Sequence, residues 1–390
     1  MYSENSNIQD ALEDFNLEGT TFSYNSFMAR LYNFCRSQGF APGKILPSRA
    51  FCSDENQGYP SILLTKHFGA FPFNHGTVGS IVATDRHGPH AHHGTDLLIV
   101  HASHVGYDPE EGSFGRYHRR HTEQFETTPT CGKIDSVLRW YLKQYTFAKE
   151  NIFLHRQDED RLITIDNQIL NEDKKEGLFL HLDNFVDVER SGIFPRKSYS
   201  TAKSFRASPE FRELLGDTAW PSQGRQPIGE RLLPKLFGFK RHLSGDPETH
   251  GLLEENLIRP MPWIVSSAFP LLTAAKANTQ VEFDRTYRTL VNGDAYHGKR
   301  LIFISGLNID ISPHQNQVFP LTMFVPWAAF IQNKNGHCSL LEQQDILNRL
   351  LEQSENNPDE IDLEAAIRKI EDTKGTKNVV LDEEVCTSEI

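Results

Sequence analysis

The sequence predicts an α/β fold in which helices flank a central sheet. Stretches typical of strands alternate with stretches of helical periodicity through the first half of the chain, as in proteins whose sheets are covered by helices. The segment Leu97–Val100 is continuously apolar, which is typical of a strand buried on both faces. The chain has 390 residues and is 38% hydrophobic, so it can bury a sizeable core.

The elements of the first half follow from local spacing. Apolar residues at helical intervals predict a helix over about residues 24–38. Residues 44–50 are expected to form a strand that delivers Cys52 at its carboxyl end. Small residues over 77–84 predict a short helix, and apolar residues at helical spacing after Cys131 predict a long one.

The second half contains a polar stretch, a predicted hairpin and an acidic tail. Apolar stretches over 300–311 and 318–331 predict the two strands of the hairpin. The chain from Leu340 to Ile390 carries −9 of the total net charge of −12. Its short helical patterns predict either a solvated appendage or a docking helix for a partner. We expect a flexible N-terminus over 1–23, a main domain over 24–335 with a polar insertion over about 150–230, and an acidic helical tail over 336–390.

Charge and cysteine content narrow the class of protein. A net charge of −12 is the opposite of the basic surface that nucleic-acid binding requires. Five cysteines in this chain indicate free thiols or metal ligands rather than a disulfide framework. No window approaches about 18 uninterrupted apolar residues, and the acidic start lacks the pattern of a secretory signal. We therefore expect a cytoplasmic, globular protein with no membrane span and no nucleic-acid partner.

Cys52, His104 and Cys131 are the residues best suited to hold a metal ion. Each is expected where a strand ends or a helix begins, which is where open α/β sheets collect their sites. Cys131 would lie at a helix N-terminus, where the helix dipole favours the thiolate that binds zinc. Two thiolates and one imidazole would leave the fourth position of a catalytic zinc site to water. The alternative is two core cysteines and a core histidine that bind no metal.

Asp54 lies two residues after Cys52, so its carboxylate could ligate the metal or orient a hydroxide bound to it. A solvated loop residue or a helix N-cap is the alternative role for such an aspartate. A thiol hydrolase that uses Cys131 and His104 would leave Cys52 and Asp54 without roles. Zinc content separates that hypothesis from a metal site.

Histidine is concentrated in one segment, since ten of the 17 histidines lie between His67 and His121. Such crowding is typical of metal binding, of proton transfer, or of a polar loop. His90, His92 and His93 precede the strand that carries His104, and an ordinary pKa of about 6.5 suits proton exchange with buffer. We hypothesise that one or more of the three, with His93 as the leading candidate, acts as a proton shuttle.

Six short motifs follow one another along the first third of the chain. They are Cys52-Ser53-Asp54-Glu55, Gly69-Ala70-Phe71 with Gly76-Thr77, Ala83-Thr84-Asp85, His104-Val105-Gly106, Gly115-Arg116-Tyr117-His118-Arg119 and Cys131-Gly132. In this order they resemble the limiting-CO2-inducible B/C family. The resemblance extends over about residues 25–335 and is weakest over about 150–230.

The resemblance implies a fold like that of β-type carbonic anhydrases, usually as a homodimer, with zinc held by Cys52, His104 and Cys131. It also implies interconversion of carbon dioxide and bicarbonate through zinc-bound hydroxide, with Asp54 beside the metal. The alternative function is that of a catalytically silent zinc-binding homologue, which acts as a binding or assembly partner in inorganic-carbon handling.

One position departs from the pattern of the β-type enzymes, which place an arginine two residues after the aspartate. In this chain that position is Asn56. A cation is needed to keep the aspartate ionised and pointed at the metal site. Arg49 is the leading substitute for it, and the other candidates are Arg86, Arg116 and Arg119.

Overall fold

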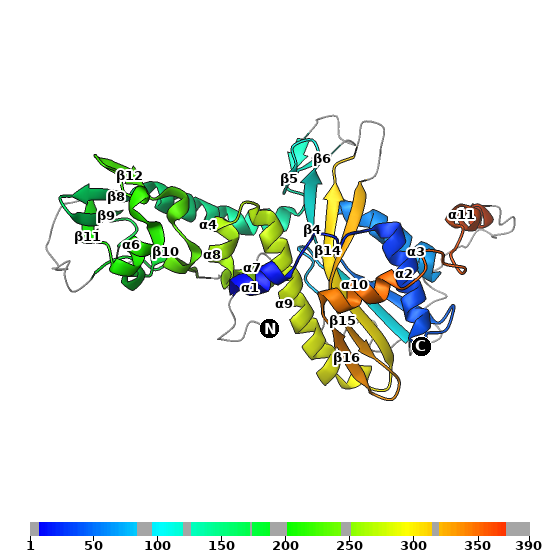
Figure 1. The fold of residues 1–390 in the computed structure, drawn as a ribbon. Helices are drawn as coiled ribbons and strands as arrows, with labels where there is room; N and C mark the ends of the chain where they lie inside the picture. Colours follow the sequence, from blue (N-terminus) through cyan, green and yellow to red (C-terminus); the bar gives the residue numbers. More distant parts are fainter. Residues whose placement is uncertain are drawn as a thin grey trace, which may run out of the picture.

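The structure, a computed structural model, contains one large mixed sheet and a second lobe with a smaller sheet of its own (Figure 1). It describes residues 8–83, 96–119, 126–171, 174–187, 201–242, 251–313 and 320–371. The predicted α/β class, with a sheet flanked by helices, is confirmed.

The large sheet has eight strands, and its main path runs in the order β1-β15-β14-β4-β2-β3. Strands β14, β4, β2 and β3 are parallel, and the predicted hairpin is confirmed as the antiparallel pair of β14 and β15. β16 extends the sheet beside β15, and β5 pairs with the end of β4. The strands span Phe22–Ser23 (β1), Ile45–Ala50 (β2), Phe73–Asn74 (β3), Asp96–Asp108 (β4), Ser113–Phe114 (β5), Arg300–Ile311 (β14), Leu321–Gln332 (β15) and Cys338–Leu341 (β16).

The central strands are buried on both faces because helices cover each side of the sheet. On one face Leu98 and Val100 of β4 pack with α2, α3 and α10. On the other face Leu97 and Ile99 pack with Phe283 of the long helix α9. The continuous apolar run of β4 follows from this double burial. The helices span Ile8–Asp14 (α1), Tyr24–Ser37 (α2), Gly58–Phe68 (α3), Gly132–Asn151 (α4), Pro209–Leu215 (α6), Gly251–Ile258 (α7), Met261–Ser266 (α8), Pro270–Asn292 (α9), Gln343–Leu351 (α10) and Leu363–Glu371 (α11).

Local signals set the ends of the helices next to the sheet. The Ser23 side chain accepts a hydrogen bond from the backbone N–H of Ser26 and so caps α2. Helix α3 ends at Gly69, whose φ of 73° is the left-handed conformation that glycine adopts without strain. Within the described ranges, none of the helices combines the length and apolar character needed to cross a bilayer.

The predicted helix over residues 77–84 is wrong over 77–83, the part of it that the structure describes. These residues form turns closed by a bridge between Gly76 and Val82. Gly79 and Ser80 have φ values of 82° and 59°, which a right-handed helix does not allow. The small residues of this segment therefore do not form a helix, because Gly79 and Ser80 adopt left-handed backbone conformations.

The second lobe lies at the far end of α4, which extends from the sheet toward it (Figure 1). Its sheet has the order β11-β9-β8-β12 and carries α6. The remaining strands form two short pairs, β6 with β7 and β10 with β13. The bounds are Tyr117–Arg119 (β6), Glu126–Thr128 (β7), Ile152–Gln157 (β8), Asp160–Asp166 (β9), Gly177–Leu180 (β10), Ala202–Arg206 (β11), Arg225–Pro227 (β12) and Phe237–Lys240 (β13).

Candidate metal centre

Three residues from separate elements meet at the carboxyl-terminal side of the parallel strands. Cys52 follows the end of β2, His104 lies in the adjacent strand β4, and Cys131 is the N-cap residue of α4. All three are buried, and one ligand atom from each lies within 4.8 Å of the other two. The structure thus brings the three predicted ligands into one group, which we call the Cys2His cluster.

Two glycines let the backbone approach this cluster closely. The backbone N–H of Gly79 donates a hydrogen bond of 3.2 Å to the Cys52 sulfur. A Cβ atom at Gly106 of β4 would lie only 2.1 Å from Thr130 Oγ1, so only glycine allows the segment before Cys131 to pass over the strand. Thr130 itself has a φ of 70°, a strained conformation for a β-branched residue, directly before Cys131.

His104 is held by one ring nitrogen and offers the other. Its Nδ1 lies 2.9 Å from a carboxylate oxygen of Asp310, and both side chains are fully buried. A proton on Nδ1 satisfies this contact, so in the neutral ring that binds a metal the lone pair lies on Nε2. In the described part of the chain, the buried Nε2 atom has no hydrogen-bond partner. A buried imidazole nitrogen beside two cysteine sulfurs is a set of donor atoms that suits a metal ion.

Asp310 lies at the centre of a buried polar network that sequence reasoning missed. It belongs to β14, where the parallel register sets it beside Gly106 of β4, two residues beyond His104. Its carboxylate also accepts hydrogen bonds from Gln57 Nε2 at 3.1 Å and from Thr322 Oγ1 at 3.2 Å. A carboxylate within an otherwise apolar predicted strand was the signal that could have revealed it, because such a group is buried only with partners.

The two thiols and the imidazole influence one another's protonation. A hydrogen bond from Cys131 lowers the pKa of Cys52 far below its usual value, and His104 lowers it further. The same hydrogen bond raises the pKa of Cys131. Burial alone would lower the pKa of His104, but the Cys131 sulfur and the Asp310 carboxylate raise it well above its usual value. The cluster therefore stabilises a thiolate, which is the form that binds metals.

Asp54 is the N-cap of a short 3-10 turn over Glu55–Gln57 and accepts a hydrogen bond of 3.0 Å from the Asn56 backbone N–H. Burial raises the pKa of its carboxyl to about 6, while the charge of His104 acts in the opposite direction. The carboxyl thus lies within electrostatic range of the cluster, although the group of close ligand atoms does not include it.

Arg49 lies in β2, where its charge acts on the buried Tyr24. Arg116 pairs with Glu111 at the surface. Arg86, His90, His92 and His93 lie outside the described residues, as does the side chain of Arg119.

The fold and the cluster together define a class: a mixed α/β protein with a buried Cys2His group beside its parallel strands. Solved structures of one protein, PtLCIB4, share the fold. PtLCIB4, a homologue of the limiting CO2-inducible protein LCIB, superposes with a TM-score of 0.50 at 12% identity over 86% of this chain and 99% of that one. A single-residue variant of PtLCIB4 gives 0.50 at 13% identity over 85% and 98%. LCIB itself gives 0.44 at 12% identity over 84% and 96%.

The predicted resemblance to the limiting-CO2-inducible proteins is therefore confirmed at the level of the fold. The sequence matches no family model, and no curated protein matches it. Because the shared identity is low, the fold is what the comparison establishes, and the chemistry must be argued from this chain's own residues.

Proposed function

We propose that this protein is a zinc enzyme of the limiting-CO2-inducible family that interconverts carbon dioxide and bicarbonate. The observation that carries the proposal is the buried Cys2His cluster with the unpartnered Nε2 of His104. The PtLCIB4 fold supports it, because a homologue of a limiting CO2-inducible protein is built on the same sheet.

The residues present fit a zinc ion. Thiolate and imidazole are donors that bind zinc well, whereas magnesium and calcium prefer oxygen ligands. Three protein ligands are typical of a catalytic zinc site. A zinc ion held by Cys52, His104 and Cys131 would lower the pKa of a water molecule so that hydroxide forms near neutral pH. We propose both the identity of the metal, zinc, and the role of these three residues as its ligands.

The chain's own residues would hold this site in shape. Asp310 keeps the His104 ring oriented and its Nδ1 protonated, as carboxylates do beside metal-bound histidines. The Gly79 N–H fixes one face of the Cys52 sulfur. Asp54, at the edge of the cluster, would accept a hydrogen bond from the attacking water and so aim its lone pair at carbon dioxide.

Three further assignments belong to the proposal. Arg49 of β2 would be the cation that keeps Asp54 ionised. His93 would pass the released proton to solvent. The homodimer and the cytoplasmic location stay predictions from the sequence. The second candidate function is a silent zinc-binding homologue, favoured by the burial of all three ligands.

Zinc content and carbon dioxide hydration, measured together, test the proposal. The purified protein should carry about one zinc per chain, and Cys52→Ser, His104→Ala and Cys131→Ser should each remove most of it. The matched control is Cys338→Ser, which replaces an exposed cysteine and should leave zinc unchanged. Asp54→Ala should keep the zinc and lose hydration activity. Wild-type protein that carries zinc but lacks hydration activity would exclude the enzyme and favour the silent zinc-binding homologue. Wild-type protein that carries no zinc would contradict both functions.

A further inference from the structure

A continuous groove runs along α10, separate from the Cys2His cluster. One hollow of about 1050 Å³ lies between α1, α9, β16 and α10, and a second of about 320 Å³ lies where α10 meets β1 and α2. The two hollows share Gly19, Thr20, Leu347 and Leu351, so they form one surface, which we call the α10 groove.

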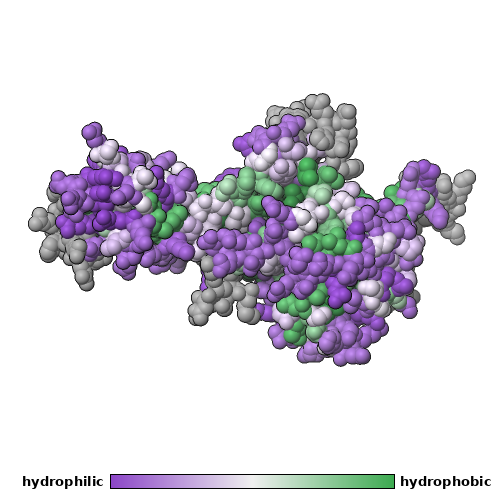
Figure 2. Space-filling model, in the orientation of Figure 1, coloured by the Kyte–Doolittle hydropathy of each residue, from purple (hydrophilic) through white to green (hydrophobic). Residues whose placement is uncertain are grey.

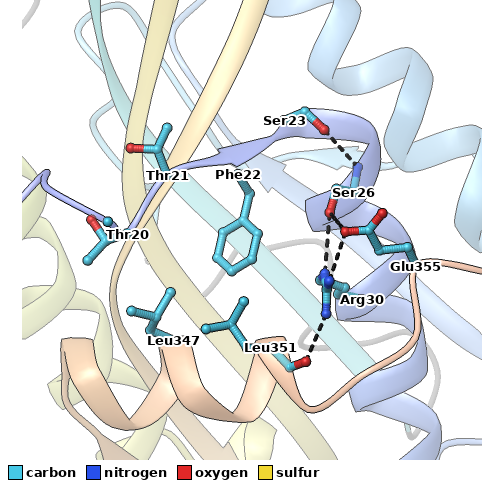
Figure 3. A pocket seen from close by; sticks show the side chains of 10 residues that line it. Thr20, Thr21, Phe22, Ser23, Ser26, Arg30, Leu347, Leu351 and Glu355 are labelled. Carbon is cyan, nitrogen blue, oxygen red and sulfur yellow. Dashed lines mark hydrogen bonds and ion pairs between the residues drawn. The ribbon is translucent and has the colours of Figure 1, made fainter.

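The floor of the α10 groove is apolar and partly open to solvent. Leu340 and Leu351 are 49% and 52% exposed, and Trp327 and Phe283 line the larger hollow beside them. Figure 3 shows Phe22, Leu347 and Leu351 gathered around the smaller hollow. Figure 2 shows hydrophobic surface near β15 and β16, bordered by hydrophilic side chains. Exposed apolar side chains bordered by a polar rim are typical of an interaction site.

The rim of the groove is strongly acidic. Seven carboxylates line it: Asp10, Asp14, Glu18, Asp284, Glu342, Asp345 and Glu355. Among the described lining residues, Arg30 is the single lysine or arginine. Its guanidinium donates to Glu355 at 2.8 Å and to the Leu351 carbonyl at 2.9 Å (Figure 3). The one lining cation is thus paired with Glu355 inside the fold. The negative charge that the groove presents is that of four other carboxylates, Asp14, Glu18, Glu342 and Asp345.

Helix capping accounts for only some of these carboxylates. Glu342 and Asp345 lie at the N-terminus of α10, where the helix dipole favours acidic groups. Asp14 ends α1, where the same dipole disfavours a negative charge, and Glu18 lies outside any helix. Like charges collected over an apolar floor repel one another, and a cationic occupant would relieve that repulsion.

We propose that the α10 groove binds a basic amphipathic helix of a partner protein. An apolar stripe on such a helix would pack on Leu340, Leu351 and Trp327, as helices pack against exposed apolar grooves. Its lysines or arginines would reach the carboxylates on both rims. Charge argues against the chain's own end as the occupant, because residues 372–390 contain five acidic and two basic residues.

The test uses the zinc-loaded full chain and synthetic peptides of about four helical turns. The first peptide places leucine on one helical face and lysine on the other, the second scrambles the same composition, and the third replaces lysine by glutamate. Binding is followed by calorimetry. The groove variants are Asp14→Asn with Asp345→Asn, and Leu340→Ser with Leu351→Ser. The matched control is Glu210→Gln with Glu213→Gln, two exposed carboxylates of α6 in the other lobe.

The ordered lysine peptide should bind, and the other two should bind about tenfold more weakly, because they lose the stripe or the charge complementarity. Neutralising Asp14 and Asp345 should weaken binding about fivefold, since exposed ion pairs contribute modestly. The leucine variant should weaken it about tenfold, and the α6 control should change nothing. Equal losses in the control, or equal binding of the scrambled peptide, would mean non-specific charge attraction and overturn the proposal. Self-association abolished by the leucine variant would instead identify a second copy as the occupant and overturn it as well.

Discussion

Replacing Asp310 by asparagine separates the role of its charge from the role of its shape. Asparagine keeps one oxygen that can accept the Nδ1–H of His104, at the position where Asp310 now accepts it at 2.9 Å. The new amide nitrogen can face Thr322, whose hydroxyl can turn to accept. Gln57 Nε2 keeps its 3.1 Å contact with that oxygen, but at its second contact, now 3.3 Å from the other carboxylate oxygen, it faces the amide nitrogen. The variant therefore keeps the orientation of His104 but removes the negative charge behind it.

The expected loss of zinc affinity is tenfold to a hundredfold, the usual effect of removing a carboxylate behind a metal-bound histidine. This corresponds to about 1.4 to 2.7 kcal/mol of binding free energy. The unfolding free energy should fall by about 1 to 3 kcal/mol in addition, because the buried Gln57 amide then faces the new amide nitrogen at one of its two contacts. A purely structural role for Asp310 would produce the second effect without the first.

The assay is competition for zinc between the metal-free full chain and a chromophoric chelator, with urea unfolding measured in parallel. Asp96→Asn is the matched control, because Asp96 is a second buried carboxylate of the same sheet, paired with Arg300 at the opposite end of β4. It should lower stability and leave zinc affinity unchanged. Wild-type zinc affinity in Asp310→Asn, or an equal loss in Asp96→Asn, would refute the reasoning.

Two further predictions concern stability. His101 is fully buried between Ser305 and the Ser80 carbonyl, and burial lowers its pKa from 6.5 to about 4. Since the unfolded chain binds more protons than the folded one in this range, about 3 kcal/mol of unfolding free energy should be lost as pH falls from 6.5 toward 4. His101→Gln should reduce this pH dependence in urea titrations of the metal-free protein. The same pH dependence in the variant and the wild type would contradict the prediction. Gly306→Ala should destabilise by about 1 to 3 kcal/mol, because its Cβ would lie 2.3 Å from the Val325 carbonyl oxygen. Gly58→Ala, in open space at a helical φ of −66°, should cost nothing, and equal thermal midpoints for the two variants would count against the packing argument.

Much of the sheet could be predicted from the sequence, because its strands are signalled locally. The continuous apolar run of β4 and the hairpin of β14 and β15 are visible as uninterrupted hydrophobic stretches with a polar turn between them. Helix α2 follows from its apolar spacing. The helix prediction for residues 77–83 was wrong because no local signal showed their conformation. It depends on left-handed backbone at Gly79 and Ser80, which brings the Gly79 N–H to the Cys52 sulfur.

The residues that can bind a metal, and their places where predicted strands end or helices begin, could be identified from the sequence alone. The sequence could not reveal that Asp310 stands behind His104, because the two residues are 206 positions apart and meet only through the parallel register of β14 and β4. The α10 groove has the same origin, since its acidic and apolar residues come from α1, α9, β16 and α10. Local propensity selects elements, whereas pairing register and packing decide which side chains face one another, and these depend on contacts distant in the chain.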